Sequence, residues 1–303
     1  MTYDFTVTKA TKSTSAVCFL VINKMQVLPS LAINSVLLNS HQHVIVGYVS
    51  KSDISSLPQN DRVSYLDLSG EAKTLSIDTG EKAYQSFDQN SFFSLVRLKW
   101  AMLEKLMLDN TFSYLIYNDV DVLWIQDPTQ VIEDSFNSIA HSEVLIQNFT
   151  SDPSQPNLCM GFVAFRNSVE SIKIIQECAS MHNLLLENNP RTGDDDVISK
   201  YYRDHSFSSA ILQLPQGLFP VGNFANLFSR KNLFPGLTPF RPYVFHANFV
   251  VGIKKKIQLS YLMLNIFSRN QQVSSSRVIL IKIELALRGR YLSLRKQVRR
   301  WIK

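Results

Sequence analysis

Two carboxylates interrupt a stretch of sequence that is otherwise composed to be buried. In YLIYNDVDVLWIQDP, at residues 114–128, Asp119 and Asp121 lie between β-branched and aromatic residues that favour a buried strand. Residues two apart on a strand point to the same side, so the two carboxylates should converge at its end. Convergent carboxylates repel each other unless they share a cation such as Mg²⁺ or Mn²⁺. The alternative is an Asx-rich turn that caps the next element, with Asp127-Pro128 as the true turn.

A lysine also lies where a helix should be apolar. FFSLVRLKWAMLEKLMLDN at 92–110 has helical periodicity, and Lys99 falls on its apolar stripe, four residues after Leu95 and three before Met102. An ammonium group on that face needs an anion. Either Lys99 reaches a phosphate or sugar held beside the two aspartates, or it snorkels to the edge or pairs with a structural carboxylate.

Three consecutive acids, Asp194, Asp195 and Asp196, begin a helix predicted to run to Tyr202. Capping explains one of them, because free N–H groups and the macrodipole favour negative charge at a helix start. Three acids exceed what capping needs. At least one is therefore expected to face a substrate hydroxyl or a developing positive charge.

The segment PYVFHANFVVGIKKKI at 242–257 joins an apolar strand to a histidine and a lysine cluster. His246 is either a satisfied structural histidine or a third metal ligand. In the second case Gly252 would allow close backbone approach, and Lys254 or Lys256 would bind phosphate.

Alternating strands and helices must position these residues. We expect strands at 16–23, 43–50, 114–121 and 158–166, helices at 26–40, 92–110, 168–187 and 194–202, and a polar, turn-rich stretch to about residue 90. This alternation predicts an α/β fold with an open, mostly parallel sheet and helices on both faces. Ligands then sit at the carboxyl ends of the strands.

The composition and the polar start of the sequence limit the classes of protein to which this chain can belong. With 303 residues and 45% hydrophobic residues, the chain can bury a large core. The polar start lacks a secretory apolar region, and no apolar run reaches the roughly 18–20 residues of a membrane span, so we expect a cytoplasmic protein. Cys18, Cys159 and Cys178 have no metal-binding spacing and are expected to be buried thiols.

The basic charge belongs to the C-terminal end. Residues 277–303 contain nine Lys and Arg and one Glu, a net charge of +8, which leaves −2 for residues 1–276 of the total of +6. Apolar residues from Leu287 to Trp301 recur at spacings of four and three, which predicts a basic amphipathic helix after a polar linker at about 268–276. Such a helix lies on anionic lipid, or it docks on the protein's own core or on a second subunit. Nucleic acid is disfavoured, because the aromatic residues line the apolar face.

Taken in order, these stretches resemble the nucleotide-diphospho-sugar transferase family of GT-A fold glycosyltransferases, of the family 77 type related to retaining xylosyl-, arabinosyl- and galactosyltransferases. The matching stretches are FFSLVRLKWAMLEKLM, YLIYNDVDVLWIQDP, LCMGFVAFRNS, GDDDVIS and HANFVVGIKKK. The resemblance implies a GT-A, Rossmann-like open mixed sheet flanked by helices at 16–256. A polar segment at 1–15 would precede it, and a basic helical extension at 257–303 would follow.

The resemblance also implies roles for individual residues. Asp121 and His246 would bind Mn²⁺ (or Mg²⁺) directly, while Asp119 would contact the ribose and share the metal sphere. Lys256 or Lys254 would neutralise the leaving diphosphate. The donor-binding set implied is Lys99, Asn118, Asp119, Gly252, Lys254 and Lys256.

Asp195 and Asp196 fall where the family has an Asp-Gln pair facing the donor sugar, and we expect them to be the catalytic carboxylates. The sequence departs from the family pattern nearby: Asp196 stands in place of a Gln, Ser199 in place of an Asn, and Cys159 in place of the Asn of an Asn-x-Gly. These departures lie on the sugar and acceptor side, so they leave open which sugar is transferred.

The implied function is metal-dependent transfer of a sugar from a nucleotide sugar, expected to be a UDP-sugar, to a glycan or glycolipid, with retention of configuration. A lipid-linked glycan acceptor on the cytoplasmic leaflet would suit a peripheral membrane protein anchored through residues 277–303. Two rival functions remain open at this point. One is a metal-dependent phosphohydrolase using the same aspartates, and the other is a non-catalytic relative that binds a glycan or partner.

Overall fold

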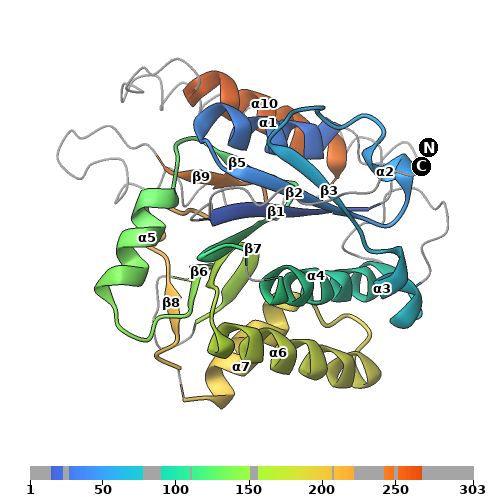
Figure 1. The fold of residues 1–303 in the computed structure, drawn as a ribbon, viewed down its shortest axis with the longest axis vertical. Coiled ribbons are helices and arrows are strands. Elements are labelled where there is room, and N and C mark those ends of the chain that lie inside the picture. The colour runs from blue at the N-terminus through green and yellow to red at the C-terminus, as the bar shows by residue number, and fades with distance from the viewer. Residues whose placement is uncertain are drawn as a thin grey trace, which may run out of the picture.

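A computed structural model describes residues 15–22, 27–77, 90–109, 111–150, 156–206, 208–221, 242–248 and 252–267. Its centre is a seven-stranded mixed sheet (Figure 1). In spatial order the strands are β3 (Val63–Asp67), β2 (His43–Tyr48), β1 (Ser15–Val21), β4 (Tyr114–Asn118), β7 (Leu158–Arg166), β6 (Val144–Asn148) and β8 (Ile211–Gln213). The first four are parallel, β7 runs antiparallel to both its neighbours, and β6 is parallel to β8.

A second, two-stranded sheet lies beside the main one. It pairs β5 (Val122–Trp124) with β9 (Val244–His246) in antiparallel register. Helix α1 (Val27–Asn39) fixes β5 in place, since the Ser35 hydroxyl accepts a hydrogen bond from the Trp124 backbone N–H and the Asn39 amide donates to the Trp124 carbonyl. The small sheet is therefore anchored to the N-terminal half of the domain.

Helices cover both faces of the main sheet, as predicted from the alternating pattern. On one face α1, α5 (Thr129–Ser138) and α10 (Ile253–Phe267) contribute to a core with Val17 and Phe19 of β1. On the other, α4 (Asn90–Leu108), α6 (Val169–Asn188) and α7 (Asp194–Asp204) pack with Ala16 and Cys18. Successive residues of β1 thus enter opposite cores, which is why the strand is apolar throughout.

The turn-rich stretch before residue 90 holds more structure than predicted. It contains α2 (Lys51–Ile54), the edge strand β3 and α3 (Ser69–Thr74). Strand β3 is only partly buried, so its sequence lacks the apolar run that marks the central strands. The strand predicted to end at residues 118–121 ends at Asn118 as β4, and the apolar residues after the aspartate turn form a separate strand, β5.

The expected end of the domain at residue 256 falls inside α10, and Met263 of that helix is buried in the core it shares with α1. The predicted linker at 268–276 and basic helix at 277–303 lie outside the described residues, as do residues 1–14. All three cysteines are buried free thiols, as predicted.

Among the helices described, none combines the length and the apolar content needed to cross a membrane.

Candidate active site

The turn between β4 and β5 carries Asp119 and Asp121 past the end of the main sheet. Its backbone is fixed by hydrogen bonds from the Asp119 N–H to the Gly161 carbonyl at 2.7 Å and from the Val122 N–H to the Asp119 carbonyl at 3.0 Å. The Asp121 side chain is 9% exposed and that of Asp119 is 33% exposed. One carboxylate is therefore held within the protein while the other faces the solvent side of the site.

Asn118 holds this turn together from the inside. Its buried amide donates to the Asp119 and Val122 carbonyls at 2.9 and 3.0 Å, and its oxygen accepts from the indole N–H of Trp124 at 2.9 Å. No side-chain hydrogen is left to donate to a nucleotide sugar. We therefore assign Asn118 to the architecture of the turn, and its predicted contact with the donor stays a prediction.

Strand β9 brings His246 to the same turn, because it pairs with β5 in a register that sets His246 opposite Val122. The imidazole is 2% exposed, and its Nε2 lies 3.3 Å from Oδ1 of Asp121. One ligand atom from each of Asp119, Asp121 and His246 lies within 4.8 Å of the others. The three residues predicted to bind metal are thus gathered from two segments more than 120 residues apart.

Gly161 of β7 provides the space for the imidazole. A Cβ at this position would lie 2.1 Å from Cε1 of His246 and 2.8 Å from both ring nitrogens. The ring therefore packs directly against the β7 backbone. Any side chain at residue 161 would displace His246 from Asp121.

Helix α10 adds a cation to the acidic pair. It begins after Gly252, whose φ of +99° is in the left-handed region that favours glycine, and the Lys256 ammonium forms an ion pair with Oδ2 of Asp121. Burial by itself raises the pKa of Asp121, but Lys256 and His246 lower it more, so the net pKa is far below the ordinary value. Lys254 is exposed on the same helix, so Lys256 is the lysine that reaches the site.

Lys99 is buried on α4, as its place in the apolar stripe predicts, with 4% of its surface exposed. Its ammonium pairs with Oδ2 of Asp194, lies 3.3 Å from Oδ1 of Asp119 and sits 4.3 Å from the centre of the Tyr117 ring. Burial lowers the pKa of Lys99, but the two carboxylates raise it further, so the pKa ends well above its ordinary value. A charged lysine is thus held between the aspartate turn and the start of α7.

The three acids of α7 have three different contacts. Asp194 pairs with Lys99, and Asp195 accepts a hydrogen bond from the Met160 N–H at 2.6 Å. Burial and the neighbouring Asp194 raise the pKa of Asp195 well above its ordinary value. Asp196 is exposed and accepts from the Gly193 N–H at 2.9 Å, as an N-terminal cap does. Asp196 is thus the acid that makes a capping contact, and its predicted catalytic role stays a prediction.

Two residues of the site were not predicted from the sequence to belong to it. Asp194 was noticed only as part of the acidic run, and nothing in the sequence links it to Lys99, which is 95 residues earlier. Tyr117, whose hydroxyl donates to Asp119 at 2.8 Å, could have been predicted from its position in the sequence. It precedes Asp119 by two residues, so the strand pattern places both side chains on one side.

Ser199 accepts a hydrogen bond from the Leu158 N–H at 2.9 Å and so supports β7.

The donor set of Asp119, Asp121 and His246 fits a divalent cation. Carboxylate oxygens are the preferred ligands of Mg²⁺, and an imidazole beside them also suits Mn²⁺. Asp121 turns one oxygen to His246, its neighbour in the proposed ligand set, and the other to the Lys256 ammonium. The group therefore has the ligand types and the proximity that such an ion requires.

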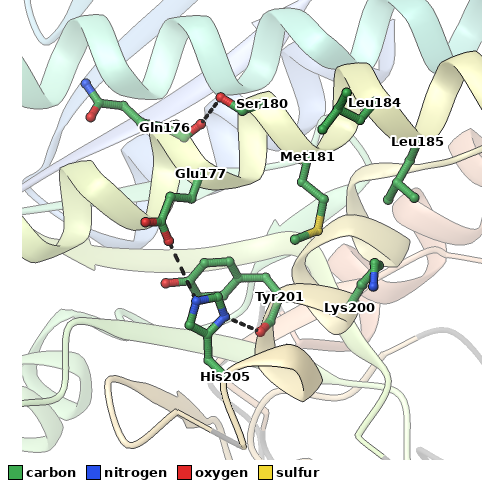
Figure 2. Close-up of a pocket in the computed structure, with 9 residues that line it drawn as sticks. All are labelled: Gln176, Glu177, Ser180, Met181, Leu184, Leu185, Lys200, Tyr201 and His205. Atoms are coloured by element: carbon green, nitrogen blue, oxygen red, sulfur yellow. Dashed lines mark hydrogen bonds and ion pairs between the residues drawn. The ribbon is translucent and has the colours of Figure 1, made fainter.

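A concave surface lies elsewhere on the molecule, away from the aspartate turn. It is an open groove of about 570 Å³ between α6 and α7, lined among others by Met181, Leu184 and Tyr201 (Figure 2). His205 stacks on Tyr201 and lies 3.8 Å from Glu177 at one side of the groove. None of the site residues described above lines it, so the groove and the aspartate turn are separate features.

Comparison with known proteins identifies the family. A family model described as nucleotide-diphospho-sugar transferase matches residues 58–259, about two thirds of the chain. The chain belongs to the nucleotide-diphospho-sugar transferase family. Its members are glycosyltransferases, and the matched region contains the aspartate turn, the acidic start of α7, His246 and Lys256. A search of curated proteins finds no match in sequence.

Two solved structures share the fold of this transferase. Mouse xyloside xylosyltransferase 1, in its apo form, matches with a TM-score of 0.52 and 13% identity over 79% of this chain and 99% of its own. The galactosyltransferase LgtC, in complex with donor and acceptor sugar analogs, matches with a TM-score of 0.50 and 11% identity over 82% of this chain and 95% of its own. At these identities the likeness establishes the fold alone, and it confirms the predicted GT-A α/β architecture.

Proposed function

We propose that this glycosyltransferase moves a sugar from a UDP-sugar to a glycan or glycolipid acceptor, with a divalent cation held by Asp119, Asp121 and His246. The observation that carries the proposal is the convergence of these three ligands within 4.8 Å, between the lysines at 99 and 256. Carboxylates, an imidazole and lysines in one place suit a diphosphate with its counter-ion. A sugar alone would need no such concentration of positive charge.

Mn²⁺ or Mg²⁺ held by these residues would supply positive charge that stabilises the negative charge on the diphosphate as the sugar leaves. In our assignment, Asp121 and His246 bind the cation from the buried side. Asp119, which is more exposed, shares the ion and reaches the ribose. Tyr117 orients Asp119 through the hydrogen bond between the phenol and Oδ1.

We assign different roles to the two lysines of the site. Lys256 lies at the start of α10, where its ammonium can shift from Asp121 to an incoming diphosphate and neutralise it as a leaving group. Lys99 is enclosed by Asp119, Asp194 and the Tyr117 ring, so we assign it to fixing those carboxylates toward the donor sugar. Gly252 permits the close approach of the α10 start to the phosphates, and the exposed Lys254 adds to the positive field there.

Asp195 is the carboxylate we assign to the sugar side of the reaction. The hydrogen bond from the Met160 N–H holds one of its oxygens, and the start of α7 carries it beside Lys99 and Asp194. Burial and Asp194 raise the pKa of Asp195, but positive charge developing on an anomeric carbon that it faces would favour its ionised form, which would stabilise that charge. Retention follows if the acceptor attacks on the face that the diphosphate leaves, with a diphosphate oxygen taking the acceptor hydroxyl proton.

A phosphohydrolase that uses two metal ions is the less favoured alternative. Such an enzyme needs a second set of ligands about 3.5–4 Å from the first ion. Within the described part of the chain, only the Asp119, Asp121 and His246 group has the composition and spacing of a metal site. A buried lysine paired with two acids also has no role in activating a hydrolytic water.

A donor-hydrolysis screen tests the proposal. Purified protein with Mn²⁺ is offered UDP-, GDP- and other nucleotide sugars, and released nucleotide is measured for the wild type, for Asp121→Ala and for Asp134→Ala. Asp134 is an exposed carboxylate on α5, outside the site, and serves as the matched control. Release from one UDP-sugar that is lost in Asp121→Ala and kept in Asp134→Ala is the expected result. Equal release by the two variants would contradict the assignment.

A further inference from the structure

Gln147 is a buried polar residue beside the site to which the proposed function gives no role. It lies near the end of β6, where the pairing of β6 with β7 shifts register between Ile146 and Gln147. Its side chain is fully buried, with 0% of its surface exposed. A buried amide is costly unless its donors and acceptor find partners, so the contacts of this side chain indicate why it is there.

The orientation of the Gln147 amide is fixed by its surroundings. Its Nε2 lies 3.4 Å from the Phe219 carbonyl and 3.3 Å from the Pro220 carbonyl. Carbonyl oxygens only accept hydrogen bonds, so the amide nitrogen must face them. The amide oxygen, Oε1, is then the atom turned to His246, at 3.3 Å from its Nδ1.

This contact requires a hydrogen on Nδ1 of His246. An amide oxygen can only accept, so Nδ1 of His246 must carry the hydrogen that it receives. With Nδ1 holding its hydrogen for Gln147, Nε2 is the nitrogen left to ligate a cation, and it lies 3.3 Å from Oδ1 of Asp121, its neighbour in the proposed ligand set. The Sγ of Cys159 also lies 3.6 Å from Nδ1, and because a thiol can accept as well as donate, this contact is compatible with a hydrogen on Nδ1.

We propose that Gln147 is a positioning residue for the metal site: its amide oxygen holds the Nδ1–H of His246, and this presents the Nε2 lone pair to the cation. The inference rests on the proposed function, because it gives the metal-binding role of His246 a second layer of support. Partners of this kind orient metal-binding histidines, and their loss weakens metal affinity about 10–100-fold. The backbone of Gly161 limits the ring from one side, and Gln147 sets its rotation at Nδ1.

A purely structural role for Gln147 makes a different prediction. The amide also ties the Phe219–Pro220 segment, and the next residue, Val221, forms a bridge to His246 in the β9 strand. If this tie were its only task, losing the amide N–H groups alone would do the same damage as losing the whole amide. Substitutions that remove either the whole amide or only its N–H groups distinguish the two cases.

The experiment measures Mn²⁺ affinity from the free-ion electron paramagnetic resonance signal, with melting temperature recorded in parallel. Gln147→Met removes both the acceptor and the donors, whereas Gln147→Glu keeps an oxygen for His246 and loses the amide hydrogens. Gln216→Met is the matched control, because Gln216 also donates to backbone carbonyls, those of Asn148 and Phe149, without contacting His246. We expect Mn²⁺ affinity to fall about 10–100-fold in Gln147→Met. In Gln147→Glu it should equal or exceed that of the wild type, and in Gln216→Met it should be unchanged.

Each other outcome overturns a stated part of the account. Wild-type affinity in Gln147→Met, or an equal loss in Gln147→Met and Gln147→Glu, refutes the positioning role. The proposed function still stands in that case, provided that the wild type binds Mn²⁺ and Asp121→Ala does not. Absence of Mn²⁺ binding by the wild type overturns both. If Gln147→Met does not fold, ¹⁵N spectra of the wild-type histidine rings with Mg²⁺ decide, with the His246 signal assigned by its loss in His246→Asn. Protonation at Nδ1 supports the inference, and protonation at Nε2 refutes it.

Discussion

Gly161→Ala is the substitution whose effect on the site follows most directly from the structure. The added Cβ would lie 2.1 Å from Cε1 of His246, whereas an ordinary van der Waals contact begins at 3.4 Å. The imidazole would have to retreat by about 1.3 Å to reach that distance. Distances between a metal ion and its ligands are held to within about 0.2 Å, so a shift of this size removes His246 from the ligand set.

The stability cost of the same substitution is smaller than its effect on metal binding. Overpacking a well-packed interior costs about 1–3 kcal/mol, which a domain of this size tolerates. We therefore expect Gly161→Ala to fold with a modestly lower melting temperature and to lose most of its Mn²⁺ affinity and donor hydrolysis. Mn²⁺ titration and thermal unfolding measure the two effects separately.

Gly47→Ala provides a matched overpacking control. Its Cβ would lie 2.5 Å from Sδ of Met102 and 2.9 Å from Cδ1 of Leu68, so it crowds the core without touching His246. It should lose stability and keep Mn²⁺ affinity. Full Mn²⁺ affinity in Gly161→Ala, or an equal loss in the Gly47→Ala control, would refute the reasoning.

Three further predictions concern titratable side chains in and near the site. Lys99→Met leaves Asp119 and Asp194 without their shared buried cation and should lower the free energy of unfolding in urea by about 3–5 kcal/mol. Asp195→Asn should abolish most turnover, whereas Asp196→Ala should cost about 0.5–2 kcal/mol of stability, as loss of a helix cap does, with turnover retained. Burial lowers the pKa of His182 below its ordinary value, so the folded state disfavours its charged form, and the free energy of unfolding should decrease as the pH falls below about 6.5.

Each of these predictions has its own control. Lys105→Met removes a partly exposed ion pair with Glu71 and should change stability by less than about 1 kcal/mol; an equal loss in Lys99→Met would contradict the importance of the buried pair. Full turnover in Asp195→Asn would count against the sugar-side carboxylate. His182→Gln should weaken the pH dependence, and an unaltered dependence would contradict its attribution to this histidine.

The central strands and the long helices were predictable from the sequence because each is encoded by a local pattern. Strand β7 is found at its predicted residues, and α4, α6 and α7 differ from the prediction by one or two residues. The short elements were not predictable in the same way. Strand β8 has three residues, too few for a periodicity to appear, and its place is set by pairing with β6.

The site was partly predictable for a related reason. Asp119, Asp121 and Lys99 stand out because each is a charged group in an apolar pattern, which local sequence reveals. The pairing of Lys99 with Asp194, and the contact of Gln147 with His246, depend on how distant segments meet in the fold. No local spacing reports such a contact, so these residues became visible only in three dimensions.

The most direct test of the account is whether nucleotide binding requires the cation held by the aspartate turn. Calorimetry of UDP binding is carried out with Mn²⁺ and with EDTA, on the wild type and on Asp121→Ala, and thermal unfolding gives an independent readout. We predict that UDP binds the wild type in Mn²⁺ and stabilises it by about 2.7 kcal/mol at 100 times the Kd, and that binding is lost in EDTA and in Asp121→Ala. UDP binding of undiminished strength in EDTA, or none in any condition, would contradict the account.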